Sequence, residues 1–230
     1  MDHSIIAPRV DLYAFIHKAL RTLMCHTLVA VGSADAGDAA EVEATLAQVR
    51  DLTSLCATHV MHENTFVHTA MEARAPGSSA ATSQEHAHHS SAIDRLNALA
   101  DSVAQASGPA RATALNRLYR SLAVFVADNL VHMEEEESAN NTVLWATHTD
   151  EELLAIEGAI HQVIQPQEMA LCMRWMLPGL NAGERAGLLA DIRKNAPEPV
   201  FEGVLGIARQ ALTGPDFAKI DLSLAQPLAA

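Results

Sequence analysis

The stretch Cys56-Ala-Thr-His59-Val-Met-His62-Glu63-Asn-Thr-Phe66-Val-His68 decides the fold of this protein. It places a histidine and a glutamate, His59 and Glu63, four residues apart in a segment whose apolar residues recur every three or four positions. Positions i and i+4 share one face of a helix. The apolar residues on the same face are Leu46, Val49, Leu52, Cys56, Phe66 and Ala70. Because a buried carboxylate is costly unless it is paired, hydrogen-bonded or bound to a metal, the stretch predicts a helix whose buried face needs polar partners from elsewhere in the chain.

The first 140 residues contain four segments with helical spacing, joined by short loops rich in glycine, proline and serine. The segments are residues 10–31, 38–73, 82–105 and 111–140. Asp38 is placed to cap the second segment, and Thr82 and Glu85 have the spacing of a capping box at the start of the third. Long helices with short connections predict an all-α fold built on an up-down-up-down four-helix bundle.

The remainder of the chain is divided into shorter helical segments by proline and glycine. The expected helices are residues 150–164, 167–177, 182–195 and 200–212, and a loosely held tail is expected from Thr213 onward. We therefore predict a bundle over residues 10–145 and a C-terminal helical extension over residues 146–230. The segment 169–180 is rich in methionine and tryptophan, which predicts that the extension packs on the bundle or on a partner, including a homodimer through the C-terminal helices.

Composition and charge exclude several functional classes. Apolar residues make up 49% of the chain and aromatic residues only 4%, with alanine and leucine dominant, as is typical of all-α proteins. The 15 basic and 28 acidic side chains give a net charge of −13, which disfavours binding to nucleic acids and to anionic membranes. The three widely spaced cysteines, with no apparent signal peptide or membrane-spanning segment, predict a soluble cytoplasmic protein.

The fourth helical segment repeats the spacing of the opening stretch, with His132 and Glu136 on its apolar face. The first and third segments carry histidine at equivalent positions, at His17 and at His86 or His89. In an antiparallel bundle, residues early in helices one and three lie level with residues late in helices two and four. All of these side chains are therefore expected to converge at one end of the bundle. Imidazole and carboxylate ligands suit iron, manganese and zinc, so the set predicts a metal site, with a hydrogen-bonded polar network as the alternative.

The succession of motifs also resembles a known family. The motifs are Ile16-His17-Lys18-Ala19-Leu20-Arg21, His59-Val-Met-His62-Glu63, Glu85-His86 and His132-Met-Glu-Glu-Glu136. They resemble a hemerythrin-like (HHE cation-binding) domain over residues 10–145. The resemblance implies a four-helix bundle that holds two iron ions in a non-haem diiron centre. By position, the implied ligands are His17, His59, Glu63, His86, His132 and Glu136, with the two glutamates bridging the irons; the same ligands also accept zinc or manganese.

The chain departs from the pattern of the oxygen-carrying members that it resembles. Ser90 stands where an HxxxH motif would place a second histidine in helix three. In helix four the carboxylate is Glu136, four positions after His132, whereas those members have the pattern HxxxxD, with an aspartate at the fifth position. The resemblance therefore implies open positions on the metals. We expect a protein that binds or senses a small ligand (oxygen, nitric oxide or peroxide) or iron status. The alternatives are a diiron oxidoreductase acting on nitric oxide, peroxide or ferrous iron, whose catalytic residues the sequence does not identify, and an iron-responsive interaction module.

Other polar residues near the motifs have more ordinary interpretations. His62 is interpreted as a residue on the flank of its helix, and His68 and His148 as exposed residues. Glu137, five positions after the histidine of its motif, is an alternative ligand. Tyr13 is expected to pack in the core close to the predicted site.

Overall fold

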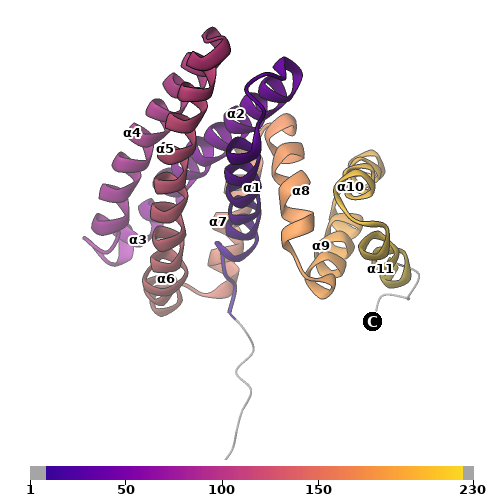
Figure 1. The fold of residues 1–230 in the computed structure, drawn as a ribbon. Coiled ribbons are helices and arrows are strands. Elements are labelled where there is room, and N and C mark those ends of the chain that lie inside the picture. Colours follow the sequence, from indigo (N-terminus) through magenta and orange to yellow (C-terminus); the bar gives the residue numbers. More distant parts are fainter. Residues whose placement is uncertain (1–8, 225–230) are drawn as a thin grey trace, which may run out of the picture.

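The computed structural model describes residues 9–224, with residues 221–224 described by their backbone alone. Within this range the chain is all-helical, and long helices form an up-down-up-down bundle, which confirms the predicted fold class (Figure 1). The bundle is built from α1 (Ala14–Ser33), α2 (Ala39–His62), α4 (Ala80–Gln105) and α5 (Gly108–Glu135). Each helix packs on the next in this order, and α5 packs back on α1, which closes the bundle. None of the described helices combines the length and apolar composition needed to cross a membrane.

Two of the bundle helices contain a π-helical turn at the same relative position. The continuations of α2 are η1 (Glu63–Val67) and α3 (His68–Arg74), and those of α5 are η2 (Glu136–Asn140) and α6 (Asn141–Thr147). Each π turn begins at the glutamate of a His-x-x-x-Glu pair, at Glu63 and at Glu136. A π turn widens the helix locally and is frequent at functional sites. The two halves of the bundle therefore share a local distortion as well as a sequence motif.

The start of α4 differs from the prediction. The expected capping box at Thr82 and Glu85 is wrong, because α4 begins at Ala80 and both side chains lie inside the helix. The Glu85 carboxylate instead reaches across to the ring of His132 on α5. A side chain engaged by a neighbouring helix is not available to cap its own, so tertiary contact overrides the local signal here.

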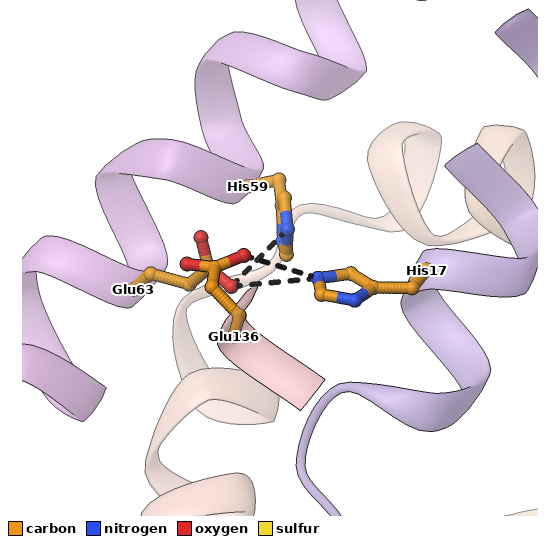
Figure 2. Close-up of side chains that lie close together, drawn as sticks. All are labelled: His17, His59, Glu63 and Glu136. Carbon is orange, nitrogen blue, oxygen red and sulfur yellow. Dashed lines mark ion pairs between the residues drawn. The ribbon is translucent and has the colours of Figure 1, made fainter. Parts of the chain in front are cut away.

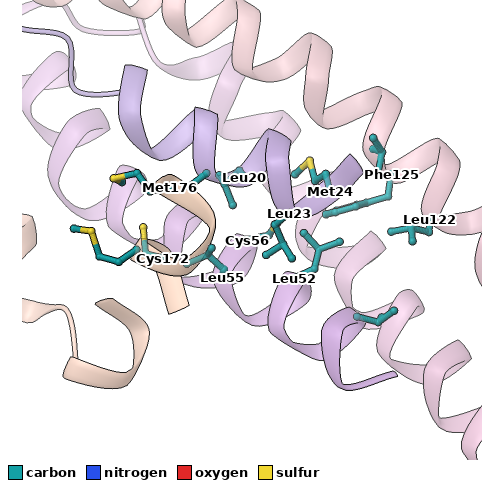
Figure 3. Close-up of a cluster of buried hydrophobic side chains, with 14 of the residues drawn as sticks. Leu20, Leu23, Met24, Leu52, Leu55, Cys56, Leu122, Phe125, Cys172 and Met176 are labelled. Carbon is teal, nitrogen blue, oxygen red and sulfur yellow. The ribbon is translucent and has the colours of Figure 1, made fainter. Parts of the chain in front are cut away.

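An apolar core fills the bundle and ends where the polar site begins. Figure 3 shows part of the larger of two clusters, with leucine, methionine and phenylalanine side chains from several helices packed together. Along α2 this cluster extends from Val42 to Cys56. A smaller cluster includes Val67 and Met71 further along the same continuous helix. His59 and Glu63 lie in the interval between the two clusters.

The C-terminal extension consists of shorter helices attached to one side of the bundle. They are α7 (Asp150–Val163), α8 (Pro166–Gly179), α9 (Ala182–Asn195), α10 (Glu198–Ala211) and α11 (Gly214–Leu224). Helix α8 packs along α1, α10 packs on α8, and α9 and α11 pack on each other (Figure 1). Cys172 and Met176 of α8 join the larger core cluster (Figure 3). The methionine- and tryptophan-rich segment therefore packs on the bundle of its own chain.

The predicted loose tail from Thr213 is wrong over the described residues. Helix α11 is regular, and its Ile220 is 2% exposed. Asp216 lies 3.3 Å from the guanidinium of Arg185 on α9, which joins the two helices by an ion pair. The apolar side chains of Phe217 and Ile220 supply the buried face that the sequence interpretation overlooked. Residues 225–230 of the predicted tail lie outside the described residues.

Candidate metal centre

The six side chains predicted as ligands meet inside the bundle. They are His17 on α1, His59 on α2, Glu63 at the start of η1, His86 on α4, His132 on α5 and Glu136 at the start of η2. Figure 2 shows four of them, with the imidazoles of His17 and His59 directed at the carboxylates of Glu63 and Glu136. Four separate helical rods thus supply one interior cluster.

These side chains form two overlapping groups of four. The first group is His17, His59, Glu63 and Glu136, and the second is Glu63, His86, His132 and Glu136. Within each group, one donor atom from every residue lies within 4.8 Å of the others. Each histidine belongs to one group, whereas both glutamates belong to both. Because a carboxylate has two oxygens, shared glutamates are suited to bridging two cations.

The carboxylates of both glutamates lie close to imidazoles of both groups. Glu63 Oε1 lies 3.2 Å from His59 Nε2, and Glu63 Oε2 lies 3.3 Å from His86 Nε2. Glu136 has the matching arrangement, with Oε2 3.5 Å from His17 Nε2 and Oε1 3.4 Å from His86 Nε2. Glu136 Oε2 also lies 3.3 Å from His132 Nε2 of the second group. Each glutamate therefore contacts imidazoles of both groups.

Six inner atoms of the cluster are buried without a hydrogen bond among the described residues. Glu63 is 3% exposed and Glu136 is fully buried, and none of their four carboxylate oxygens has a hydrogen-bond partner among the described residues. The same holds for Nε2 of His17 and of His59. An unsatisfied buried polar group costs about 1–3 kcal/mol, and more when it is charged. A bound metal would give all of these atoms a partner, so the ligand set fits metal ions.

The charges within the cluster shift its pKa values in opposite directions. Burial opposes a charge on His17, but neighbouring carboxylates outweigh burial and raise the pKa of His17 to about 10. Burial also opposes a charge on His86, but neighbouring carboxylates raise the pKa of His86 to about 9. Burial lowers the pKa of His59 to about 4. Burial also opposes ionisation of Glu136, yet the surrounding imidazoles hold its pKa well below the usual value. The carboxylates are therefore ionised, and the imidazoles of His17 and His86 are protonated at neutral pH.

Three of the four imidazoles have a hydrogen-bond acceptor on their outer nitrogen, Nδ1. The pairs are His17 with Glu137 at 2.9 Å, His86 with Asn64 at 2.8 Å and His132 with Glu85 at 2.5 Å. An acceptor at Nδ1 fixes the tautomer that leaves the Nε2 lone pair for a metal. Glu137, the alternative ligand, belongs to neither group of four and lies on the outer side of His17.

His86 lies in the cluster, and its alternative, His89, lies beside it. The ring of His89 packs against the ring of His132, with centroids 4.6 Å apart, and against Phe125. Its Nδ1 is buried without a hydrogen bond, and burial lowers the pKa of His89 to about 4. His89 therefore forms part of the wall next to the site and is absent from both groups of four.

Two histidines interpreted as exposed are buried, so those predictions are wrong. His68 is 4% exposed and its ring stacks on that of His86, with centroids 4.9 Å apart. His148 is 8% exposed and contacts the hydroxyl of Thr147 through Nδ1 at 2.8 Å. His68 follows the π turn directly, and the extra residue of that turn changes which later residues face inward. No periodicity signal in the sequence marks this change.

Two further residues adjoin the cluster. Tyr13 is 1% exposed and packs in the smaller core cluster, and its hydroxyl accepts a hydrogen bond of 3.2 Å from Asn140 in η2. His62 is 6% exposed, with Nδ1 3.7 Å from Glu168 on α8. The residue next to Glu63 thus faces the C-terminal extension.

Comparison with protein families gives a match over the first part of the chain. The family described as hemerythrin HHE cation binding domain matches residues 9–141. This region is more than half of the 230-residue chain and contains all six side chains of the two groups. Comparisons with curated proteins and with solved structures found no match.

Proposed function

Because this chain belongs to the hemerythrin HHE cation-binding family, we propose that it is a non-haem diiron protein that binds a small ligand such as oxygen, nitric oxide or peroxide. Binding of that ligand would allow the protein to sense or handle it, or to report iron status. Two bound irons would supply the redox-active position at which the ligand binds. The proposal places the protein in the cytoplasm, since all three cysteines are free, as is usual in a reducing compartment.

One observation carries the proposal: two groups of two histidines share the same two glutamates. Mononuclear sites have no need of two shared carboxylates. Histidine and carboxylate suit iron, zinc and manganese alike, and membership of the family favours iron among them. With two imidazoles and two shared carboxylates for each metal, coordination positions remain for a small ligand, as in iron sites with two histidines and one carboxylate.

The surroundings of the cluster favour an apolar ligand over water. Leu52 and Leu122 of the larger core cluster are fully buried, and Cys56 and Phe125 are nearly so. On the other side, the smaller cluster around Tyr13 closes the bundle. Apolar walls exclude water and strengthen electrostatic interactions inside the site.

The test is metal analysis combined with optical spectroscopy. The metal-free protein is loaded with ferrous iron without oxygen, desalted, and analysed for bound metal. Its spectrum is then recorded before and after addition of oxygen or nitric oxide. We expect two irons per chain and a spectral change on adding one of these gases. Fewer than two metals in a fully loaded sample would overturn the diiron assignment.

Matched variants sharpen this test. His86→Ala should lose metal, whereas His88→Ala should retain it, because His88 lies on the same helix and is exposed. Both substitutions remove an imidazole from α4 and change helix propensity equally. Equal metal content in the two variants would contradict the assignment of His86.

One observation favours the oxidoreductase as a second candidate. The Glu85 side chain is 38% exposed and also contacts His132 of the cluster, so it joins solvent to a predicted ligand. Reduction of peroxide or nitric oxide consumes protons, which such a contact could supply. Repeated consumption of peroxide or nitric oxide with a recycled reductant would support an enzyme. Binding of one equivalent without turnover would reject it.

A further inference from the structure

Arg21 and Glu137 form a hydrogen-bonded pair outside the cluster, and Glu137 contacts His17 of the cluster. Glu137 Oε1 lies 2.9 Å from Nδ1 of His17. The Arg21 guanidinium donates to both oxygens of the same carboxylate, at 2.5 Å from Nη1 and 3.1 Å from Nη2. The His17 side chain is completely buried, whereas Glu137 and Arg21 are 29% and 31% exposed. The three side chains thus form a chain of contacts from the interior to the surface.

The positions of these residues in their helices explain the arrangement. Arg21 follows His17 by one turn of α1, so both project from the same face. Glu137 follows Glu136 within the π turn η2. Two adjacent glutamates of η2 consequently contact the two nitrogens of one imidazole, Glu136 at Nε2 and Glu137 at Nδ1.

The four histidines differ in this outer contact. The outer acceptor of His86 is the neutral amide of Asn64, and that of His132 is the carboxylate of Glu85. Among the described residues, no outer hydrogen-bond partner of His59 is found. His17 and His59 belong to the same group of four, so Glu137 is the one outer acceptor found for this group among the described residues.

We propose that Arg21 and Glu137 are positioning residues that hold His17 ready to bind one of the two metals, an inference that rests on the diiron function proposed above. Glu137 accepts the Nδ1 proton, which directs the Nε2 lone pair toward Glu63 and Glu136. Arg21 binds Glu137 through two N–H groups and restricts the carboxylate to one orientation. Loss of either residue lowers the metal affinity of the group that contains His17 and His59. The metal affinity of the group that contains His86 and His132 stays unchanged.

The test measures stepwise metal binding by the full-length protein. Ferrous iron is titrated without oxygen into metal-free protein in competition with a chromophoric chelator. In wild type we expect two metals per chain. In Arg21→Ala and in Glu137→Gln, one of the two affinities should fall by about 10–100-fold, the usual effect of removing a partner of a metal-bound histidine. Arg21→Lys keeps the charge but not the planar fork, so it should restore part of the loss.

The matched control is Arg50→Ala. Arg50 also forms an ion pair with a carboxylate, Asp101 at 2.9 Å, between α2 and α4 at the protein surface. The Arg50→Ala variant should bind both metals with the affinities of wild type. The double variant Arg21→Ala/Glu137→Gln should bind metal no more weakly than the single variants, because Arg21 and Glu137 act through the same histidine.

The outcomes separate the two proposals. Fewer than two metals in wild type overturns the diiron function and this inference with it. Two metals in wild type with unchanged affinities in Arg21→Ala overturns the positioning role alone. Equal weakening of both metals, with a lower unfolding temperature of metal-free Arg21→Ala than of metal-free Arg50→Ala, shows a general structural role and also overturns it.

Discussion

The Nε2 atoms of His86 and His132 lie 3.0 Å apart across the α4–α5 interface. The outer nitrogens of both rings face oxygen acceptors, so each ring donates its Nδ1 proton outward. Two inward lone pairs at this separation would repel each other. In the metal-free protein, a proton between the rings would relieve this repulsion. In the metal-bound protein, a metal held by both rings would relieve it. Metal and protons therefore compete for the same nitrogens.

Metal binding should release protons and strengthen as the pH rises. The pKa of His17 is raised to about 10 and that of His86 to about 9, against burial, by neighbouring carboxylates. At neutral pH these rings are protonated without metal, so uptake must displace their protons. Affinity should increase with pH up to about 9–10 and then level off. Calorimetric titration in two buffers of different ionisation enthalpy measures the proton release, and binding without release would contradict the arrangement.

The free energy of unfolding of the metal-free protein should fall as the pH rises. The pKa values of His17 and His86 are raised above the ordinary value of 6.5, so their protonated rings stabilise the folded protein. This stabilisation is fully present below pH 6.5. It is lost as the pH rises through about 9 and about 10. Urea unfolding of metal-free protein from pH 6 to pH 10 should show this decline. It should be smaller in His17→Gln, and an equal decline in that variant would contradict the prediction.

Loss of a shared glutamate should affect both metals, whereas loss of a histidine should affect one. Glu136 belongs to both groups of four, so Glu136→Gln should weaken both affinities by about 100-fold or more. His59→Ala should weaken one affinity, because His59 belongs to a single group. The same chelator competition measures both variants. Glu135→Gln, an exposed neighbour on the same helix, is the control and should bind as wild type does.

Gly179→Ala should destabilise the contact between α8 and α1. A Cβ at this position would lie 2.8 Å from the carbonyl oxygen of Lys18 and 2.7 Å from Oγ1 of Thr22, too close for both helices to keep their positions. Overpacking of this kind costs about 1–3 kcal/mol in the free energy of unfolding. Gly158→Ala, within α7 and with open space around it, should instead stabilise the protein by about 0.5–1 kcal/mol. Urea unfolding at fixed metal content distinguishes the two, and equal effects would contradict the close packing of α8 on α1.

Asp38→Ala should destabilise α2, the helix that carries His59. The Asp38 carboxylate accepts hydrogen bonds from the backbone N–H groups of Ala40 and Glu41 at 2.9 and 3.1 Å, as its position in the sequence predicts. Removal of such a cap costs about 1 kcal/mol. Ser107→Ala at the start of α5 is the control, since Ser107 makes no capping hydrogen bond with its side chain. A change for Asp38→Ala no larger than for Ser107→Ala would contradict the prediction.

Much of the site could be predicted because its chemistry repeats at helical spacing. The pairs His59/Glu63 and His132/Glu136 interrupt apolar faces, and short loops require the helices to be antiparallel. Together with the histidines early in the first and third segments, these two facts place the polar side chains at one end of the bundle without coordinates. The choice of His86 over His89 could not be made in this way, because both share a face of α4. His86 contacts Glu63 in η1 and Glu136 in η2, whereas His89 packs against Phe125 and His132 of α5.

The sequence by itself determined the four bundle helices, their antiparallel order and the two His-x-x-x-Glu pairs of the polar site, since periodicity and turn chemistry are local properties. Only the tertiary structure decided the π turns at Glu63 and Glu136, the burial of His68, and the contacts of Glu85 and Glu137 with histidines on other helices. Each of these depends on how one helix meets another, and helical spacing describes a single helix. The outer partners that distinguish one histidine from the next therefore became visible only when the four helices were brought together.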